Sequence, residues 1–418
     1  MGLQKLYLPL STLPKELTRL KIGNQVYFFN LIDHLPTLLS SVCPHMGNEV
    51  IQNVKGDLHC PVHVWNFDTT GKCTNVSNRQ LEKYPIEQDE NGFFILVNDK
   101  MAQRKNLDHE LSLTDTILFK LVAHACLEIK VGDEVIYTDP WFKGPAFLGS
   151  WYPYPKPNTR GLNPKPNAIF ITHEHSDHLH PASLSEFNKD TLIVFPDFPN
   201  QRIEKILRKT GFNNLKALTF GCEFTLSEKI SLTCFEPESV WNDSILFFNL
   251  AGLRWLNLND AGLNQRLTKK LEKVDLVSST FSFGASGFPL TWTNFSDEEK
   301  IEMMQRSNLG RIEQIRTSMK LYKAAYFLPF ATHFSFWHPS HMHFLKIARR
   351  NSVDTISKAF ESEESFDVID ILPGESWKVN AEKVNYHYKD RSVFYDKDNI
   401  RRFVSTTFSE DAFKEAAP

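Results

Sequence analysis

The stretch Ala168-Ile169-Phe170-Ile171-Thr172-His173-Glu174-His175-Ser176-Asp177-His178 joins a short apolar run to three imidazoles and an aspartate. Its apolar residues predict a buried strand. The side chains of His173, His175, Asp177 and His178 therefore follow the end of that strand, where a loop can curl around a metal ion. Imidazole and carboxylate groups this close together are typical metal ligands. The stretch predicts a metal centre, and a solvated cluster of histidines is the alternative.

Length and composition limit the class of protein that can contain this centre. With 418 residues, 41% hydrophobic and 23% charged, the chain is long enough for two or three ordinary globular domains. The net charge of -3 gives no overall positive field for nucleic acid or an anionic membrane. The most apolar stretch, 245–253, is too short to span a membrane, and the first residues do not have the pattern that we would expect of a secretory leader. We expect a cytoplasmic protein that binds neither nucleic acid nor membranes.

A second set of candidate ligands lies near the N-terminus. Cys43-Pro44-His45 and Cys60-Pro61-Val62-His63 each supply one thiolate and one imidazole. A zinc ion could take all four, whereas a Rieske 2Fe-2S cluster takes the two thiolates on one iron and the two imidazoles on the other. One Cys and one His from each loop favours the cluster, because zinc knuckles pair Cys with Cys. We predict that Cys43, His45, Cys60 and His63 bind a Rieske cluster.

The pattern His-x-His-x-Asp-His of residues 173–178 resembles the signature of the metallo-β-lactamase fold, a sandwich of two sheets flanked by helices. In that resemblance Asp139 braces the metal loop and Asp260 is the bridging carboxylate. His338 is our choice for the last histidine ligand, with His333 as the competitor. The third motif has no histidine here, so either a carboxylate fills that place, Glu236 or less favourably Glu238, or the site has one ligand fewer. A carboxylate there makes the site harder and suits iron better than zinc.

The domain organisation follows from these motifs. Residues 22–100 read as short alternating strands with turn residues between them, and the polar segment 98–115 reads as a boundary. We predict an α+β protein, with a small all-β Rieske domain at 1–104 followed by an αββα metallo-β-lactamase-like sandwich at 105–385. Residues 386–418 are expected to form a C-terminal tail.

A Rieske cluster transfers single electrons and has no use beside redox-inert zinc, so we expect iron at the second centre. Ordinary Rieske oxygenases hold iron on an Asp/Glu-x-x-His-x4-His element, and no pair of histidines five residues apart in this chain has the required acidic residue. The lactamase-type centre is therefore the candidate for oxygen chemistry.

Taken together, the motifs resemble those of the CMP-N-acetylneuraminate hydroxylases, which join a Rieske domain to a metallo-β-lactamase-like domain. The resemblance runs from about residue 25 to about 345. Besides the Cys/His pairs, it rests on the stretches His124-Ala125-Cys126, Asp139-Pro140-Trp141, Gly144-Pro145-Ala146-Phe147, Ser176-Asp177-His178-Leu179, Gly284-Ala285-Ser286-Gly287-Phe288-Pro289, Pro329-Phe330-Ala331 and His338-Pro339-Ser340. We interpret His124 itself as a core or supporting histidine rather than a metal ligand.

The resemblance implies hydroxylation of the N-acetyl methyl group of a CMP-linked sialic acid or similar nucleotide sugar, using O2 and two electrons. A reductase, ferredoxin or cytochrome would supply the electrons through the Rieske cluster. The implied di-iron site places His173, His175 and Glu236 on one side, Asp177, His178 and His338 on the other, and Asp260 between them. Glu236 and Asp260 are the implied catalytic carboxylates.

Three other functions fit the same motifs. One is an oxygenase of this architecture that acts on a different amide or amine. Another is a phosphodiesterase or lipid hydrolase of the lactamase fold with a structural Rieske-like domain, which the missing third-motif histidine disfavours. The third is a non-catalytic redox sensor, for which a complete set of metal ligands would be unnecessary.

Overall fold

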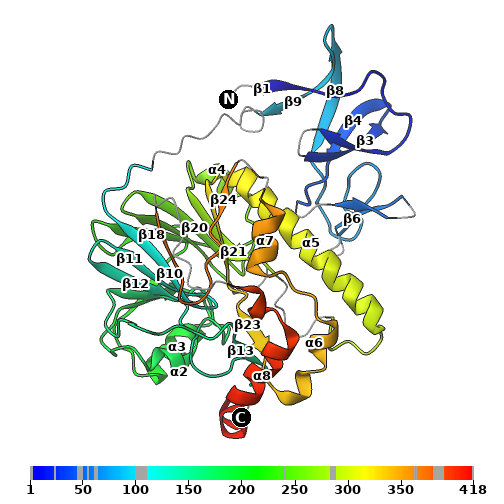
Figure 1. The fold of residues 1–418 in the computed structure, drawn as a ribbon. Coiled ribbons are helices and arrows are strands. Elements are labelled where there is room, and N and C mark those ends of the chain that lie inside the picture. Colours follow the sequence, from blue (N-terminus) through cyan, green and yellow to red (C-terminus); the bar gives the residue numbers. More distant parts are fainter. Residues whose placement is uncertain are drawn as a thin grey trace. The chain divides into compact units, whose positions relative to one another are not determined.

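The computed structural model describes residues 3–22, 25–44, 50–53, 56–60, 65–98, 111–238, 242–282, 289–361, 363, 365–379 and 390–416. The chain divides into two compact units (Figure 1): residues 1–108 with Leu309–Ser318, and residues 109–308 with 319–418. Each unit is described by itself below.

Strands make up the described elements of the N-terminal part of the first unit. The larger sheet is antiparallel, in the order β1-β9-β8-β4-β3-β2: β1 (Leu3–Tyr7), β9 (Gly92–Asn98), β8 (Lys83–Asp89), β4 (Leu35–Ser40), β3 (Gln25–Ile32) and β2 (Thr18–Ile22). The smaller sheet is β5 (Ile51–Gln52), β6 (Leu58–Cys60) and β7 (Trp65–Phe67). Side chains alternate across β3, so Phe28 packs in one core cluster while Tyr27 and Phe29 pack in the other.

The second unit contains two seven-stranded sheets. The first has the order β16-β15-β14-β12-β11-β10-β25: β16 (Leu215–Leu218), β15 (Ile193–Pro196), β14 (Ala168–Phe170), β12 (Glu134–Thr138), β11 (Cys126–Val131), β10 (Ile117–Ala123) and β25 (Ser376–Lys378). The second has the order β17-β18-β19-β20-β21-β22-β24: β17 (Glu223–Thr225), β18 (Ile230–Phe235), β19 (Ile245–Leu250), β20 (Leu253–Asn259), β21 (Leu276–Thr280), β22 (Tyr326–Phe330) and β24 (Asp367–Val368). A two-stranded sheet pairs β13 (Trp151–Pro153) with β23 (Phe334–Phe336).

The two large sheets pack face to face through aromatic side chains. The ring of Phe119 on β10 lies edge-on to Trp255 on β20 at 5.4 Å, and Phe170 on β14 lies edge-on to Phe248 on β19 at 5.0 Å. All four side chains are fully buried and belong to one core cluster. Burial of aromatic area on both inner faces stabilises the sandwich.

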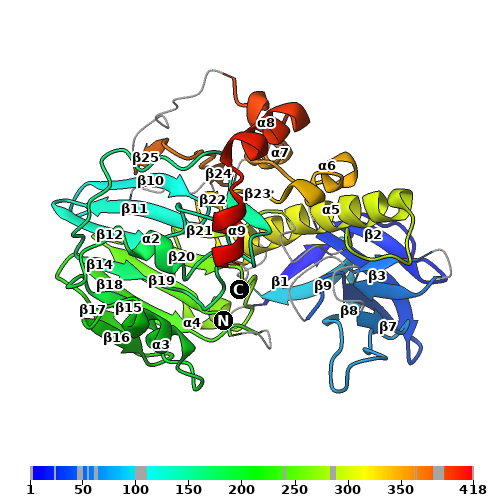
Figure 2. The same ribbon diagram turned by 90° about the horizontal axis from the view of Figure 1, so that it is seen from below.

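Helices flank this sandwich (Figures 1 and 2). Their bounds are α2 (Pro181–Leu184), α3 (Arg202–Lys209), α4 (Leu267–Lys270), α5 (Asp297–Tyr322), α6 (Phe344–Ile347), α7 (Val353–Ala359), α8 (Lys397–Thr407) and α9 (Glu410–Ala416), with short 3-10 turns η1 (Pro339–His341) and η2 (Ser392–Phe394). Leu184 and Leu207 pack α2 and α3 against the outer face of the first sheet. None of the helices in the described ranges is both long and apolar enough to cross a membrane.

The segment expected as a tail is folded. Residues 397–416 form α8 and α9, and the indole nitrogen of Trp337 donates a hydrogen bond to Oγ1 of Thr407 at 3.1 Å. Val404 of α8 is 2% exposed. This segment therefore packs as part of the second unit.

Candidate metal centre

Strand direction collects the candidate ligands at one edge of the sandwich. β12 and β14 are parallel, so Asp139 and the 173–178 stretch follow the same ends of neighbouring strands. β10 and β12 both run antiparallel to β11, so the turn at His124 lies at that edge too. Asp260 directly follows β20 of the other sheet. In α/β sheets, ligand-binding sites usually form from residues at the carboxyl ends of the strands.

Asp139 braces the metal loop, as the resemblance implied. One carboxylate oxygen accepts the backbone N–H of Thr172 at 2.7 Å, and the other accepts the Thr172 hydroxyl at 2.7 Å. The second oxygen also lies 3.0 Å from Nδ1 of His178 and accepts Nδ2 of Asn259 at 2.7 Å. A carboxylate on Nδ1 leaves Nε2 of His178 as the atom that faces the centre, the arrangement that orients histidine ligands in metal sites.

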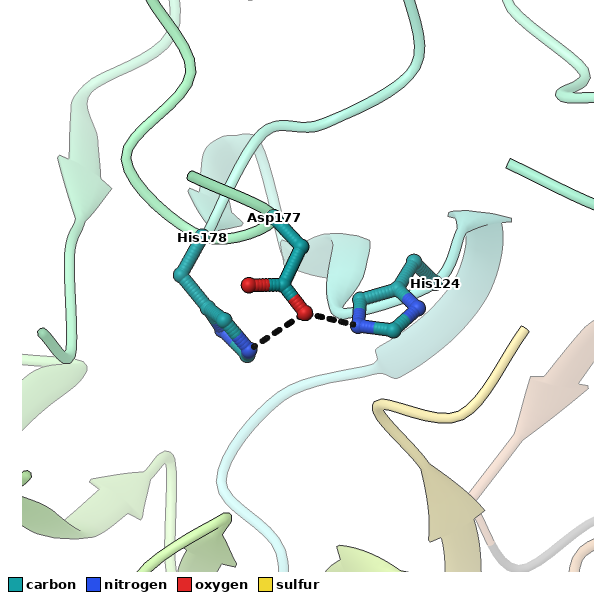
Figure 3. Close-up of side chains that lie close together, drawn as sticks. All are labelled: His124, Asp177 and His178. Atoms are coloured by element: carbon teal, nitrogen blue, oxygen red, sulfur yellow. Dashed lines mark ion pairs between the residues drawn. The ribbon is translucent and has the colours of Figure 1, made fainter. Parts of the chain in front are cut away.

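The first group of candidate ligands is buried. Figure 3 shows Asp177 between the rings of His124 and His178, with Oδ2 at 3.2 Å from Nε2 of His124 and 3.6 Å from Nε2 of His178. The exposed fractions of the three residues are 3% or less. One ligand atom from each residue lies within 4.8 Å of the others.

The second group is open to solvent. It consists of His173, His175 and Asp260, whose ligand atoms also lie within 4.8 Å of one another. Nε2 of His173 is 2.9 Å from Nδ1 of His175. His173 is buried, but His175 is exposed and the Asp260 side chain is 30% exposed. A small molecule could therefore approach this group from outside.

Asp260 lies between the two groups. Its Oδ2 atom is 3.3 Å from Nε2 of His178 and 4.0 Å from Nε2 of His173. One carboxylate oxygen thus faces a histidine of each group, which is the place of a bridging ligand in a two-metal site.

A further carboxylate, that of Asp243, lies against the open group. Its Oδ1 atom is 3.6 Å from Nε2 of His173, and its residue is 6% exposed. Asp243 precedes β19, and the adjacent Ser244 hydroxyl donates to the carbonyl of Thr172 at 2.7 Å. That bond ties the start of β19 to the metal loop and brings Asp243 against His173.

Two predicted ligands lie elsewhere. Glu236 is exposed, and in the described part of the chain it belongs to neither group; its backbone carbonyl accepts a hydrogen bond from Asn264. The ring of His338 packs against Phe413 at 4.5 Å, with Nδ1 2.6 Å from the Ser340 hydroxyl, because η1 follows it directly and uses this ring as its cap. The histidine that completes the buried group is His124, which the sequence led us to interpret as a core or supporting histidine. His333 is buried and packs against Phe281.

The backbone at this edge is strained. His124, Asp139, Asn259 and Ala331 each end or follow a strand with φ between 34° and 54°. Non-glycine residues rarely adopt this left-handed region, at a cost on the order of 1 kcal/mol each, and such strain gathers at functional sites. Three of the four, His124, Asp139 and Asn259, present side chains to the candidate centre or to the ring of His178.

Unsatisfied buried atoms indicate that these residues fit a metal. Both ring nitrogens of His124, Oδ1 of Asp177, Nε2 of His178 and Oδ1 of Asp243 are buried without a hydrogen-bond partner. Leaving such an atom unpaired costs about 1–3 kcal/mol. An ion binds one nitrogen of an imidazole, so a cation at each group would satisfy one ring nitrogen of His124 together with the listed atoms of Asp177, His178 and Asp243. Imidazole with carboxylate is a donor set that iron accepts.

The electrostatics agree with this fit. Burial lowers the pKa of His173 well below its ordinary value, and the rings of His178 and His175 lower it further, so His173 is a neutral ligand. Burial opposes charge on His178 too, but the carboxylates of Asp177 and Asp139 outweigh it and raise the pKa of His178 well above its ordinary value. Burial and the nearby Asp260 raise the pKa of Asp243 to about 6. A bound cation would relieve this crowding of carboxylates.

A pocket opens beside the exposed group. It has a volume of about 670 Å³, within the usual range for small-molecule sites. His175 lines it together with residues of the metal loop, of the loop before β13, and of α2, α3 and α9: Pro145, Ala146, Phe147, Leu148, Glu174, Ser176, His180, Pro181, Arg202, Asn242 and Ala416. The candidate metal centre is therefore reached through a cavity that could hold a sugar-sized ligand.

In the first unit, Cys43 and Cys60 are buried, with exposed fractions of 0% and 1%, in one core cluster with Phe28, Leu58 and Phe67. Cys60 ends β6, and Cys43 follows β4. The other two predicted cluster ligands, His45 and His63, lie outside the described residues, as does 284–288 of the resemblance.

Comparison with known proteins identifies both domains. Residues 8–85 match the Rieske 2Fe-2S domain, and residues 119–279 match the β-lactamase superfamily domain. These matches confirm the predicted α+β architecture, an all-β Rieske domain followed by a metallo-β-lactamase sandwich, and with it the Rieske cluster as a cofactor.

Two curated relatives carry the same name. The cytidine monophosphate-N-acetylneuraminic acid hydroxylase of Asterias rubens is 27% identical over 346 residues, covering 78% of this chain and 52% of the relative. That of Mus musculus is 25% identical over 373 residues, covering 84% of this chain and 63% of the relative. The chain thus spans half to three fifths of the length of these relatives.

Among solved structures, CmlA, a diiron β-hydroxylase from Streptomyces venezuelae, matches 64% of this chain and 54% of its own. The identity is 13% and the TM-score 0.42, too low to bear on function. The domain matches and the curated relatives together show a chain that joins a Rieske 2Fe-2S domain to a β-lactamase superfamily domain and is similar to the CMP-N-acetylneuraminic acid hydroxylases.

Proposed function

We propose that this protein is an O2-dependent hydroxylase whose Rieske cluster feeds electrons to a pair of irons beside the pocket. The observation that carries the proposal is the juxtaposition of two His/Asp groups on either side of Asp260, in a chain that also contains a Rieske domain. Two adjacent metal sites sharing a carboxylate suit O2 chemistry, and the Rieske domain gives them a source of electrons.

The ligand sets follow from the geometry. His124, Asp177 and His178 would hold the buried ion; His173, His175 and Asp243 would hold the exposed one; and Asp260 would contact both. When bound, the cluster and the two irons supply electron transfer and O2 activation.

The chain's own residues position this centre. Asp139 and Asn259 fix the ring of His178 from behind, so its Nε2 atom faces the metal position. The ring of Phe147 lies 6.0 Å from that of His175, and its backbone N–H donates to the Ser176 hydroxyl at 2.8 Å. These contacts hold the loop that carries His175 next to Phe147 at the open group.

The proposed substrate is a CMP-linked sialic acid or a similar nucleotide sugar. The similarity to the named hydroxylases supports it, and so does Arg202, a cation lining the pocket that could meet a phosphate or carboxylate. In the reaction the N-acetyl methyl C–H bond is replaced by C–OH. One oxygen atom of O2 enters the product and the other leaves as water, with two electrons and two protons consumed. A reductase, ferredoxin or cytochrome supplies the electrons.

The test is metal analysis of the anaerobically purified protein, with visible and electron paramagnetic resonance spectra, followed by turnover of CMP-N-acetylneuraminic acid with O2 and a chemical reductant. We expect about four irons per chain, two of them in a Rieske cluster with its characteristic signal. N-glycolyl product should form with one oxygen atom from O2. The proposal fails if zinc fills the second centre and iron reconstitution gives no O2 consumption, which is the result expected of a hydrolase.

A further inference from the structure

The C-terminal segment Lys397–Ala416 reaches the pocket from outside both matched domains. Ala416 at the end of α9 lines the same cavity as His175 and the metal loop. The β-lactamase superfamily match ends at residue 279, so nothing in the matched domains accounts for this wall. α9 comes from a segment that the sequence left without a role.

A close contact keeps α9 in this place. A Cβ atom added at Gly149 would overlap the ring of Phe413, so this side chain occupies space that glycine leaves open. Gly149 also has φ of +81°, a conformation that favours glycine. On its other side Phe413 packs against the ring of His338 at 4.5 Å. The phenyl ring is therefore enclosed between a glycine and an imidazole.

The segment has further anchors on the same surface. The ring of Trp337 packs against Phe408 at 5.0 Å, and its indole N–H donates to Thr407. Tyr154 packs against Phe403 of α8 at 4.9 Å. Aromatic contacts of this kind add about 0.5–1.5 kcal/mol each beyond the area they bury. They hold α8 and α9 on the loop and strand next to the pocket.

The loop that receives Phe413 is also the loop that shapes the pocket. Phe147 and Leu148 line the cavity and have left-handed backbone angles, φ of 47° and 53°. Strained residues keep such a conformation only where their surroundings determine it. Gly149 follows them directly, so docking of Phe413 bears on the conformation of two pocket residues.

We propose that α9 is the outer wall of the substrate pocket, that Ala416 contacts the bound substrate, and that Phe413 holds this wall and the 147–148 turn in place. The inference rests on the proposed function for the identity of the substrate. It assigns the C-terminal segment a part in substrate selection, because the size of residue 416 sets the room beside the exposed metal group.

The first test compares two bulky substitutions on the same helix in the full-length holoenzyme. Ala416→Trp should raise KM for CMP-N-acetylneuraminic acid roughly tenfold with kcat changed less than about twofold, the pattern of lost binding without lost chemistry. Glu415→Trp is the matched control, since Glu415 is exposed and does not line the pocket. Equal KM values for the two variants would overturn the proposal.

The second test needs no turnover. Hydrogen–deuterium exchange of the full chain should become roughly tenfold faster in residues 144–151 and 174–176 when Phe413→Ala releases α9. Phe413→Leu keeps an apolar side chain and should restore most of the protection. Unchanged exchange in Phe413→Ala would overturn the proposal even if the wild-type protein hydroxylates nothing. Absence of iron and of turnover, with the exchange result as expected, would instead count against the proposed function alone.

Discussion

The two groups of candidate ligands differ in their exposure to solvent and in how they are braced. His124, Asp177 and His178 are buried, and the Asp139 and Asn259 side chains fix His178 from behind. In the other group His175 is exposed and faces a pocket. Under the proposed function, the buried group would hold an ion firmly, whereas the open group would let an ion meet O2 and substrate.

The largest effect is expected where the two groups meet. Asp260→Ala removes the oxygen that faces both His173 and His178. The affinity for both ions should decrease, and the rate of hydroxylation should fall by more than roughly a hundredfold. Even residues that only orient a metal ligand contribute 10- to 100-fold to metal affinity or activity. Metal content by mass spectrometry and turnover are the measurements. Retention of both ions with near-normal activity would mean that the groups act separately.

Removal of the buried histidine should cost one ion. His124→Ala leaves Asp177 and His178 without their third partner, so the tightly held ion should be lost while the Rieske signal stays. His338→Ala is the matched control variant, because the ring of His338 packs against Phe413 and belongs to neither group of candidate ligands. We expect one iron fewer per chain in the first variant and an unchanged count in the second. The reverse result would restore His338 as the last ligand.

A smaller effect should distinguish the two acidic residues of the β18–β19 hairpin. Asp243→Ala should lower the affinity of the open group for its ion about 10- to 100-fold, because a carboxylate 3.6 Å from His173 is lost. Glu236→Ala should change metal affinity less than about twofold, since that side chain is exposed. Competition with a chelator measures both affinities. If Glu236→Ala causes the larger loss of metal affinity, then Glu236 and not Asp243 is the metal ligand of this hairpin.

How far the sequence predicts this site depends on whether a ligand is marked by its neighbours in the chain. The 173–178 stretch follows an apolar run and contains four metal-binding side chains, so its own pattern indicates it, whereas Asp260 was expected only from the resemblance to the metallo-β-lactamase fold. His124 is a lone histidine in a hairpin turn. It reaches the centre because β10 and β12 both run antiparallel to β11, which is a matter of topology.

The sequence did not single out Asp243, for a related reason. Glu236 and Asp243 stand at the two ends of one hairpin loop, and both follow or precede a strand. A single tertiary hydrogen bond, from Ser244 to the carbonyl of Thr172, brings the second end against His173. Strand alternation, metal-ligand spacing and the resemblance pointed to the fold and to every residue of the two groups except His124, but a contact of this kind has no local signature. The same holds for the packing of α9 on Gly149.

The smallest effect concerns the pocket beside the open group. Arg202 lines the pocket, and its guanidinium lies 3.0 Å from Glu174 of the metal loop with the side chain 65% exposed. An ion pair this exposed contributes little to folding, so loss of the charge should appear in substrate binding. Arg202→Gln should raise KM for an anionic substrate about three- to tenfold and leave kcat and metal content unchanged.

Arg208 provides the control for that substitution. It lies on the same helix, pairs with Glu204 and does not line the pocket. Arg208→Gln removes the same charge from the surface and should leave KM within about twofold, because a solvent-exposed charge at a distance is screened by salt. If both variants raise KM equally, the effect comes from the general field of α3. If only Arg202→Gln raises KM, and the difference in KM between the two variants persists at high salt, then Arg202 makes a direct charged contact with the substrate beside the open group. The buried group has no such contact in the proposed arrangement.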